Sequence, residues 1–230
     1  MERRNFLKKT LVAGTVSAVA GKSVIGNTLF KPVNQNKKFK LNYAPHFGMF
    51  KNHAGEDLID QLKFMADQGF TAMFDNGLMN KSPLQQEKIA KTVNQLNMEK
   101  GPFVLYADFS KESFVLDHAE VHDMLTKKMK EGIETAKRTN FKQALVVPGR
   151  YNQRMEWDYQ AANVIENLKY CAEILEPAGV VMVLEPLNPH DHPGLFLTKM
   201  PRHIIFAGLL IVQVVRLLTI FITSRSLRET

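Results

Sequence analysis

The run Val180-Val-Met-Val-Leu184, followed directly by Glu185-Pro-Leu-Asn188, decides the fold of this chain. Its apolar, largely β-branched residues are typical of a strand that is buried on both faces. The acidic residue at its end adds a polar group where a buried strand leaves the core. Comparable short runs predict further strands at residues 39–44, 70–74, 102–106 and 143–147.

Helical patterns separate these strands. Apolar residues recur at helical spacing, and Ser82 to Gln85 form a capping box with Pro83 at the first helical position. The alternation predicts repeated β–α steps and a parallel sheet. The expected helices cover residues 55–68, 83–100, 117–139 and 156–176.

Doubly wound sheets and TIM barrels both fit this alternation. No G-x-G-x-x-G motif follows the first expected strand and no Walker loop is present, which weighs against nucleotide-binding folds. Polar residues instead follow the ends of the strands, where a TIM barrel builds its site. These residues are His46, Asp75, Asn76, Asp108, Arg150 and Glu185.

Composition and charge narrow the class of protein. The chain has 230 residues, of which 45% are hydrophobic and 23% charged, so it is neither wholly disordered nor collagen-like. The formal net charge is +7, but residues 1–20 and 201–230 each carry +3 and residues 21–200 only +1. A basic nucleic-acid-binding face is therefore not expected. Cys171 is the single cysteine, which excludes an intrachain disulfide, and we expect a buried structural thiol.

Residues 1–37 predict an export signal and a linker rather than part of the domain. Arg3-Arg4 followed by Phe6-Leu-Lys8 resembles a twin-arginine signal, and Ala18-Val-Ala20 fits a cleavage site after Ala20. The apolar stretch is too short to span a bilayer stably. We therefore expect export to the periplasm, with a short basic amphipathic helix as the alternative.

One segment in the second half resembles a known family. Val183 to Asn188 with Pro189-His-Asp-His-Pro-Gly194, supported by Tyr43-Ala-Pro-His46 and Val147-Pro-Gly-Arg150, resembles the xylose-isomerase-like TIM barrels. This is the sugar phosphate isomerase/epimerase superfamily, and hydroxypyruvate isomerase is the branch it resembles most. The resemblance covers residues 38–200 and implies a (β/α)8 barrel with strands one to five present and strands six to eight missing.

The resemblance implies a divalent metal at the mouth of the barrel. Its ligands in the family are a Glu after strand five, an Asp in a D-x-x-H segment, a His or Gln after strand seven and a Glu after strand eight. The two Glu residues also move a proton through an enediolate of a hydroxy-carbonyl substrate. By position Glu185 is the first of them, as metal ligand and catalytic carboxylate, and its ligand type fits Mg, Mn, Co or Zn.

Four further residues are candidates for binding a small-molecule substrate. His46 lines the pocket or caps a loop, and Arg150 holds a carboxylate or phosphate or covers the rim. His190 and Asp191 lie in the loop after Glu185, which often contacts substrate in the family. The sequence does not define the oligomeric state. We expect membrane contact only during export, unless the C-terminal segment is an anchor.

Residues 201–230 break the family pattern. Ile204 to Ile222 is nearly all apolar and long enough to span a membrane, although Arg216 opposes insertion. Residues 201–230 can be back-translated with permitted synonymous codons. When that nucleotide sequence is read one nucleotide earlier, it contains no stop codon and encodes a helix and a strand followed by D-x-x-H. We therefore expect a nucleotide lost near codons 199–201 and a tail that is not native domain.

A chain with this tail lacks the other ligands, so we expect it to be poorly soluble and inactive and not to retain the metal. Another reaction on the same barrel, such as sugar epimerisation or dehydration, is one alternative. The other is an exported, membrane-anchored sugar-binding or scaffold protein.

Overall fold

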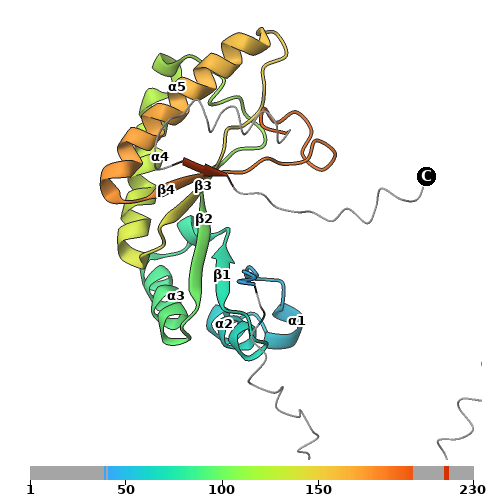
Figure 1. Ribbon diagram of the computed structural model, residues 1–230, viewed down its shortest axis with the longest axis vertical. Coiled ribbons are helices and arrows are strands. Elements are labelled where there is room, and N and C mark those ends of the chain that lie inside the picture. Colours follow the sequence, from blue (N-terminus) through green and yellow to red (C-terminus); the bar gives the residue numbers. More distant parts are fainter. Residues whose placement is uncertain (1–38, 40, 199–214, 218–230) are drawn as a thin grey trace, which may run out of the picture. The chain divides into compact units, whose positions relative to one another are not determined.

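A parallel sheet forms the centre of the described structure. The computed structural model describes residue 39, residues 41–198 and residues 215–217. Within these residues five parallel strands follow one another in chain order across the sheet (Figure 1). They are β1 (Ala72–Asp75), β2 (Glu99–Ala107), β3 (Gln143–Val147), β4 (Val181–Leu184) and β5 (Val215–Leu217).

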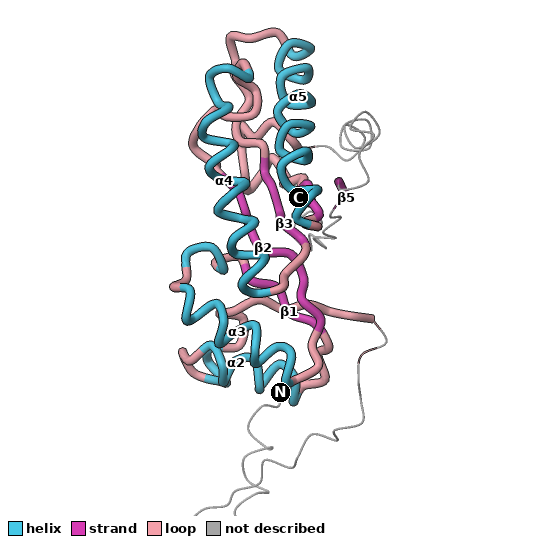
Figure 2. The backbone as a smooth tube through the Cα atoms, turned by 90° about the vertical axis from the view of Figure 1, so that its left-hand side faces the viewer, coloured by secondary structure: helices cyan, strands magenta, loops and turns pink. Residues whose placement is uncertain are grey.

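Helices connect the strands and lie side by side along one face of the sheet (Figure 2). Asp57, Ser82 and Asp117 accept backbone N–H groups at the starts of α2, α3 and α4, which explains where these helices begin. The helices are α1 (Lys51–Ala54), α2 (Leu58–Asp67), α3 (Pro83–Gln95), α4 (His118–Thr139) and α5 (Trp157–Leu175), with short 3₁₀ turns η1 (Leu78–Asn80) and η2 (Glu176–Ala178).

The main hydrophobic core lies between the sheet and this helix layer. Alternate residues of the strands, such as Phe103 and Val146, are buried together with Leu125 of α4 and Leu168 of α5. On the opposite face of the sheet a smaller cluster is built from Leu145, Val147, Leu195, Phe74, Val104 and Leu187. Both faces of the strands are therefore apolar, which explains their near-continuous hydrophobic sequences.

The expected strand at residues 39–44 is wrong. The segment before β1 joins the sheet only at one parallel bridge between His46 and Phe74, where the Phe74 N–H donates to the Pro45 carbonyl at 3.0 Å. Leu41 and Tyr43 are exposed, so this segment lacks the two-sided burial that stabilises a parallel strand. The expected strands at 70–74, 102–106, 143–147 and 180–184 are present as β1 to β4.

Both terminal predictions lie largely outside the described residues. The export signal and linker at residues 1–37 fall there entirely, as does the tail at 201–230 except for β5, which pairs with β4. No helix in the described part of the chain has the length and apolarity needed to cross a bilayer.

Candidate active site

The carboxyl ends of the strands bring polar residues to one edge of the sheet. Because β1 to β4 are parallel, the residues that follow them lie at the same edge. Asp75 ends β1, Asp108 follows β2, Arg150 follows β3 and Glu185 follows β4. This edge holds the sequence-predicted site residues and is the candidate site.

Glu185 is the carboxylate best placed for chemistry at this edge. Its backbone N–H donates to the Val146 carbonyl at 3.4 Å, which continues the pairing of β4 with β3. Its side chain is partly buried, and burial raises the pKa of the carboxyl above 4.5. No hydrogen bond or ion pair to this carboxylate occurs among the described residues. Glu185 is therefore a carboxyl with a strengthened affinity for a proton.

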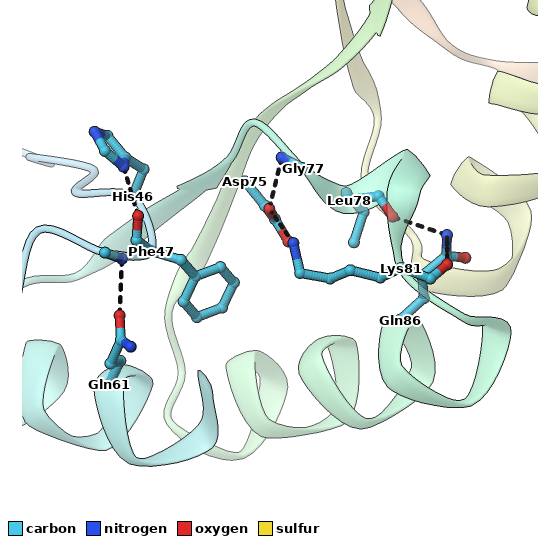
Figure 3. A network of polar contacts seen from close by, with 9 residues as sticks. His46, Phe47, Gln61, Asp75, Gly77, Leu78, Lys81 and Gln86 are labelled. Atoms are coloured by element: carbon cyan, nitrogen blue, oxygen red, sulfur yellow. Dashed lines mark hydrogen bonds and ion pairs between the residues drawn. The ribbon is translucent and has the colours of Figure 1, made fainter. Parts of the chain in front are cut away.

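Asp75 is a second buried carboxylate, at the end of β1. It is 1% exposed, and its Oδ1 accepts a hydrogen bond from Lys81 Nζ at 2.8 Å and from the Gly77 N–H at 3.0 Å (Figure 3). Its Oδ2 is buried without a hydrogen-bond partner in the described structure. Burial raises the pKa of Asp75, although Lys81, Gly77 and His46 act in the opposite direction.

His46 lies beside Asp75, in the loop that precedes α1. The imidazole is exposed, and its Nδ1 is 2.7 Å from the Phe47 carbonyl oxygen (Figure 3). The Phe47 ring lies 5.3 Å from Lys81 Nζ, so this loop also packs against the Asp75–Lys81 pair. Gln61 of α2 holds the loop by accepting the Gly48 N–H at 2.8 Å. The backbone of His46 thus pairs with Phe74, the neighbour of Asp75, while its imidazole points away from the Asp75 carboxylate (Figure 3).

Arg150 connects three of the loops that follow strands. Its guanidinium donates to the carbonyls of Phe109, after β2, at 3.3 Å and of Pro193, after β4, at 3.1 Å. Gly194 has φ +84°, and a Cβ there would lie 2.4 Å from the guanidinium, so only glycine leaves room for it. Arg150 holds backbone carbonyls in this structure, and its contact with a substrate anion stays a prediction.

His190 and Asp191 lie on the loop that follows Glu185. Asn188 organises this loop, because its Oδ1 accepts the N–H groups of His190 and Asp191 and its Nδ2 donates to Asp191 Oδ2 at 2.9 Å. Both residues are exposed. Their contacts with a substrate stay predictions. In this structure the carboxylate of Asp191 accepts a hydrogen bond from Asn188 within the loop.

The described residues at this edge of the sheet do not by themselves fit a resident metal ion. No three His, Cys, Asp or Glu side chains in the described part of the chain are grouped so that they hold a metal together. Glu185 alone occupies a position that the family resemblance assigns to a ligand. Its role as metal ligand therefore stays a prediction, and no chemical step is assigned to a metal.

The sequence pattern places Asp75 among the polar residues at strand ends but does not identify it, or Lys81, as a site residue. The signal was an Asp that closes an apolar strand, followed six positions later by a Lys. The ion pair that joins them is a tertiary contact across the turn η1, and spacing alone does not reveal it.

The comparisons with known proteins agree with this geometry. The sequence profile described as "Xylose isomerase-like TIM barrel" matches residues 62–200, and the chain belongs to this family. Its sheet and helices are those of an incomplete TIM barrel. The search of curated proteins finds no match.

Solved structures with this fold include enzymes and a metal-binding protein. AP endonuclease, family 2, from Brucella melitensis is 17% identical with a TM-score of 0.63, covering 76% of this chain and 66% of its own. 3-Keto-D-glucoside 4-epimerase (YcjR) from E. coli is 14% identical with a TM-score of 0.60, covering 77% and 67%. IolI protein with a bound zinc atom is 15% identical with a TM-score of 0.58, covering 76% and 62%. This chain thus spans about two thirds or less of these structures.

Proposed function

We propose that this chain derives from an isomerase or epimerase that moves a proton between neighbouring carbons of a small hydroxy-carbonyl or sugar substrate. The observation that carries the proposal is Glu185, a partly buried carboxyl with a raised pKa at the carboxyl end of β4. In this family of barrels the carboxyl ends of the strands form the site.

The chemistry follows from the properties of a carboxyl group in this position. A hydrogen on the carbon between a carbonyl and a hydroxyl group is acidic enough for a well-placed general base to remove. Removal leaves an enediolate, and return of the proton to the other carbon, or to the other face, gives isomer or epimer. A carboxylate whose pKa is raised by burial is a stronger base for this step than a free one.

The substrate belongs to the class of hydroxypyruvate and small ketoses. Epimerases of ketoses and keto-glycosides have the same fold, including a D-psicose 3-epimerase from Clostridium cellulolyticum H10, 11% identical with a TM-score of 0.60, covering 77% of this chain and 62% of that one. Hydroxypyruvate follows from the resemblance of residues 183–194 to hydroxypyruvate isomerase. A divalent metal, which this resemblance implies, requires ligands beyond Glu185.

We further propose that the rest of the barrel is encoded out of frame after codon 200 and that the parent enzyme is exported by a twin-arginine signal. The codons of β5 overlap those that encode, in the shifted frame, the strand before the D-x-x-H segment. β5 itself consists of residues read in the given frame, so the support for the frame change is the D-x-x-H segment in the shifted reading of residues 201–230.

The test is a comparison of two chains. Residues 1–200 joined to the shifted-frame continuation should catalyse exchange of the substrate C–H with deuterium from D₂O, followed by NMR with hydroxypyruvate and with fructose. Glu185→Gln in that chain should abolish exchange, and the 230-residue chain should show none. Exchange by the Glu185→Gln protein would contradict the assigned base, and exchange by the 230-residue chain would contradict the truncation.

A further inference from the structure

Three aromatic side chains that the proposed function does not use form a compact cluster on the outer helix layer. His118 and His122 lie one turn apart on α4, and Tyr170 faces them from α5. Their ring centroids form a triangle with sides of 5.2 Å between the histidines and 4.7 Å from each histidine to Tyr170. Histidines at positions i and i+4 share one helix face, which is the spacing of two-imidazole metal sites.

The hydrogen-bond partners assign the tautomer of His118. Asn167 donates through Nδ2 to the carbonyls of Phe114 and Leu116, so its Oδ1 is the atom that accepts from His118 Nδ1 at 2.8 Å. In the neutral ring, Nε2 then carries a lone pair. An imidazole whose Nδ1–H is held by a carbonyl oxygen is oriented as metal-bound histidines are.

His122 has the same tautomer. Its Nδ1 lies 3.2 Å from the carboxylate of Asp123, which only accepts, so Nδ1 is the donor and Nε2 the acceptor. Tyr170 therefore donates its hydroxyl proton to His122 Nε2 at 2.6 Å, and its oxygen accepts from Thr126 at 2.6 Å. The His122 Nε2 and the phenol oxygen of Tyr170 are thus 2.6 Å apart, and the ring of His118 lies against both side chains.

This cluster is accessible from solvent. The His122 side chain is 45% exposed, and His118 and Tyr170 line a shallow hollow of about 580 Å³. The charged groups around that hollow are Glu166, Glu173 and Lys169, and Asp123 adds an exposed carboxylate beside His122. The acidic groups outnumber the lysine, which favours a cation.

We propose that His118, His122 and Tyr170 form a binding site for a divalent transition-metal ion such as Zn²⁺. Nε2 of both histidines and the oxygen of Tyr170 supply three ligands, and water supplies the fourth. Ligands at about 2.0 Å in tetrahedral geometry lie about 3.3 Å apart, so the 2.6 Å contact of Tyr170 with His122 has to open slightly. The phenol proton passes to solvent as the ion binds. This site is independent of the strand ends and of the proposed function.

The test is calorimetric titration of the metal-free 230-residue chain with ZnCl₂. We expect one bound ion per chain, with affinity weakened at least about tenfold by His118→Ala or His122→Ala and weakened also by Tyr170→Phe. His53→Ala is the matched control, because His53 is an exposed helical histidine outside the cluster, and it should bind as the parent does.

A second measurement on the unaltered chain does not depend on the folding of variants. Diethyl pyrocarbonate modifies free imidazole nitrogens, and mass spectrometry locates the modified residues. Zn²⁺ should protect His118 and His122 and leave His53 reactive. Zinc affinity that survives both histidine substitutions, an unchanged affinity in Tyr170→Phe, or the absence of protection at His118 and His122 would each overturn the proposal.

Discussion

Lys81 Nζ lies 2.8 Å from Oδ1 of Asp75, while Oδ2 of the same carboxylate is buried without a partner in the described structure. The carboxylate is therefore half satisfied: one oxygen has two donors, and the other is buried without a donor among the described residues. A buried unpaired acceptor costs about 1–3 kcal/mol. This cost falls at the carboxyl end of β1, beside the proposed site.

Asp75→Asn tests this cost through the pH dependence of stability. Burial raises the pKa of folded Asp75 above 3.8, so the folded chain binds this proton more tightly than the unfolded chain does. The contribution of Asp75 to stability is therefore greatest below pH 3.8 and is lost as the pH rises through the folded pKa. We expect the free energy of unfolding of Asp75→Asn, measured with urea from pH 4 to 7, to increase relative to that of the parent as the pH rises toward the folded pKa of Asp75, and the difference to be constant above it.

Asp57→Asn is the matched control for that experiment. Backbone N–H groups of Asp60 and Ile59 lower the pKa of this exposed capping residue below 3.8. Its stabilising contribution is thus present above pH 3.8 and lost as the pH falls through the lowered folded pKa, so between pH 4 and 7 the variant should differ from the parent by a nearly constant amount. A constant difference between Asp75→Asn and the parent at all pH values would contradict the raised pKa.

Glu185→Gln should stabilise the chain while removing the proposed base. Since burial raises the pKa of Glu185 above 4.5, its charged form is disfavoured in the folded chain at neutral pH. We expect the melting temperature at pH 7.5 to rise by up to about 4 °C, and at pH 4 to stay the same. Glu173→Gln on exposed α5 surface serves as control. A lower melting temperature at pH 7.5 would show that the carboxylate has partners that stabilise its charge.

Arg150→Met should loosen the loop that follows Glu185. The guanidinium donates to Phe109 and Pro193, and these charge-assisted bonds hold the loop against its neighbours. The Tyr151 N–H that donates to the Gly194 carbonyl at 3.1 Å should exchange with deuterium at least about tenfold faster, since each lost bond is worth about 1.5–3 kcal/mol. Hydrogen exchange with mass spectrometry measures this. Unchanged exchange would favour Arg150 as a residue free to bind a substrate anion.

Cys171 should resist thiol reagents until the chain unfolds. It lies in the main core on α5, and burial raises the pKa of its thiol to about 12. Almost none of it is thiolate at pH 8, and the reagent has no access. A disulfide reagent such as DTNB should label less than a tenth of the folded chain within minutes and all of it in guanidinium. Rapid labelling of the folded chain would contradict the burial.

The sheet and helices could be predicted from the sequence because the local signals, such as apolar strand runs and helix caps, agree with the elements in the structure. β3 covers the predicted residues 143–147, and α4 starts after the cap Asp117 and ends before Asn140, whose φ is +57°. The predicted strand at residues 39–44 is wrong because alternating aromatic residues also occur in segments that cover a sheet without pairing as a strand. A strand depends on partners that are far away in sequence, and Leu41 and Tyr43 lack them.

The position of Glu185 could be predicted, but its surroundings could not. An acidic residue that ends a buried strand lies at the sheet edge in any parallel barrel. The partners of Arg150 come from loops about 40 residues away on either side, so sequence left rim and substrate roles open. The same holds for two other features, which arise only when distant elements pack together. They are the buried Asp75 oxygen without a hydrogen-bond partner in the described structure and the cluster of His118, His122 and Tyr170.

The most direct test of the account is the nucleotide sequence of the gene, from codon 190 to several hundred bases past codon 230. The account predicts a frame interrupted near codons 199–201, with the shifted frame continuing through D-x-x-H to a His or Gln and then a Glu at barrel spacing. An intact frame with no such continuation downstream would contradict it, because Glu185 would then have no partners with which to form the site.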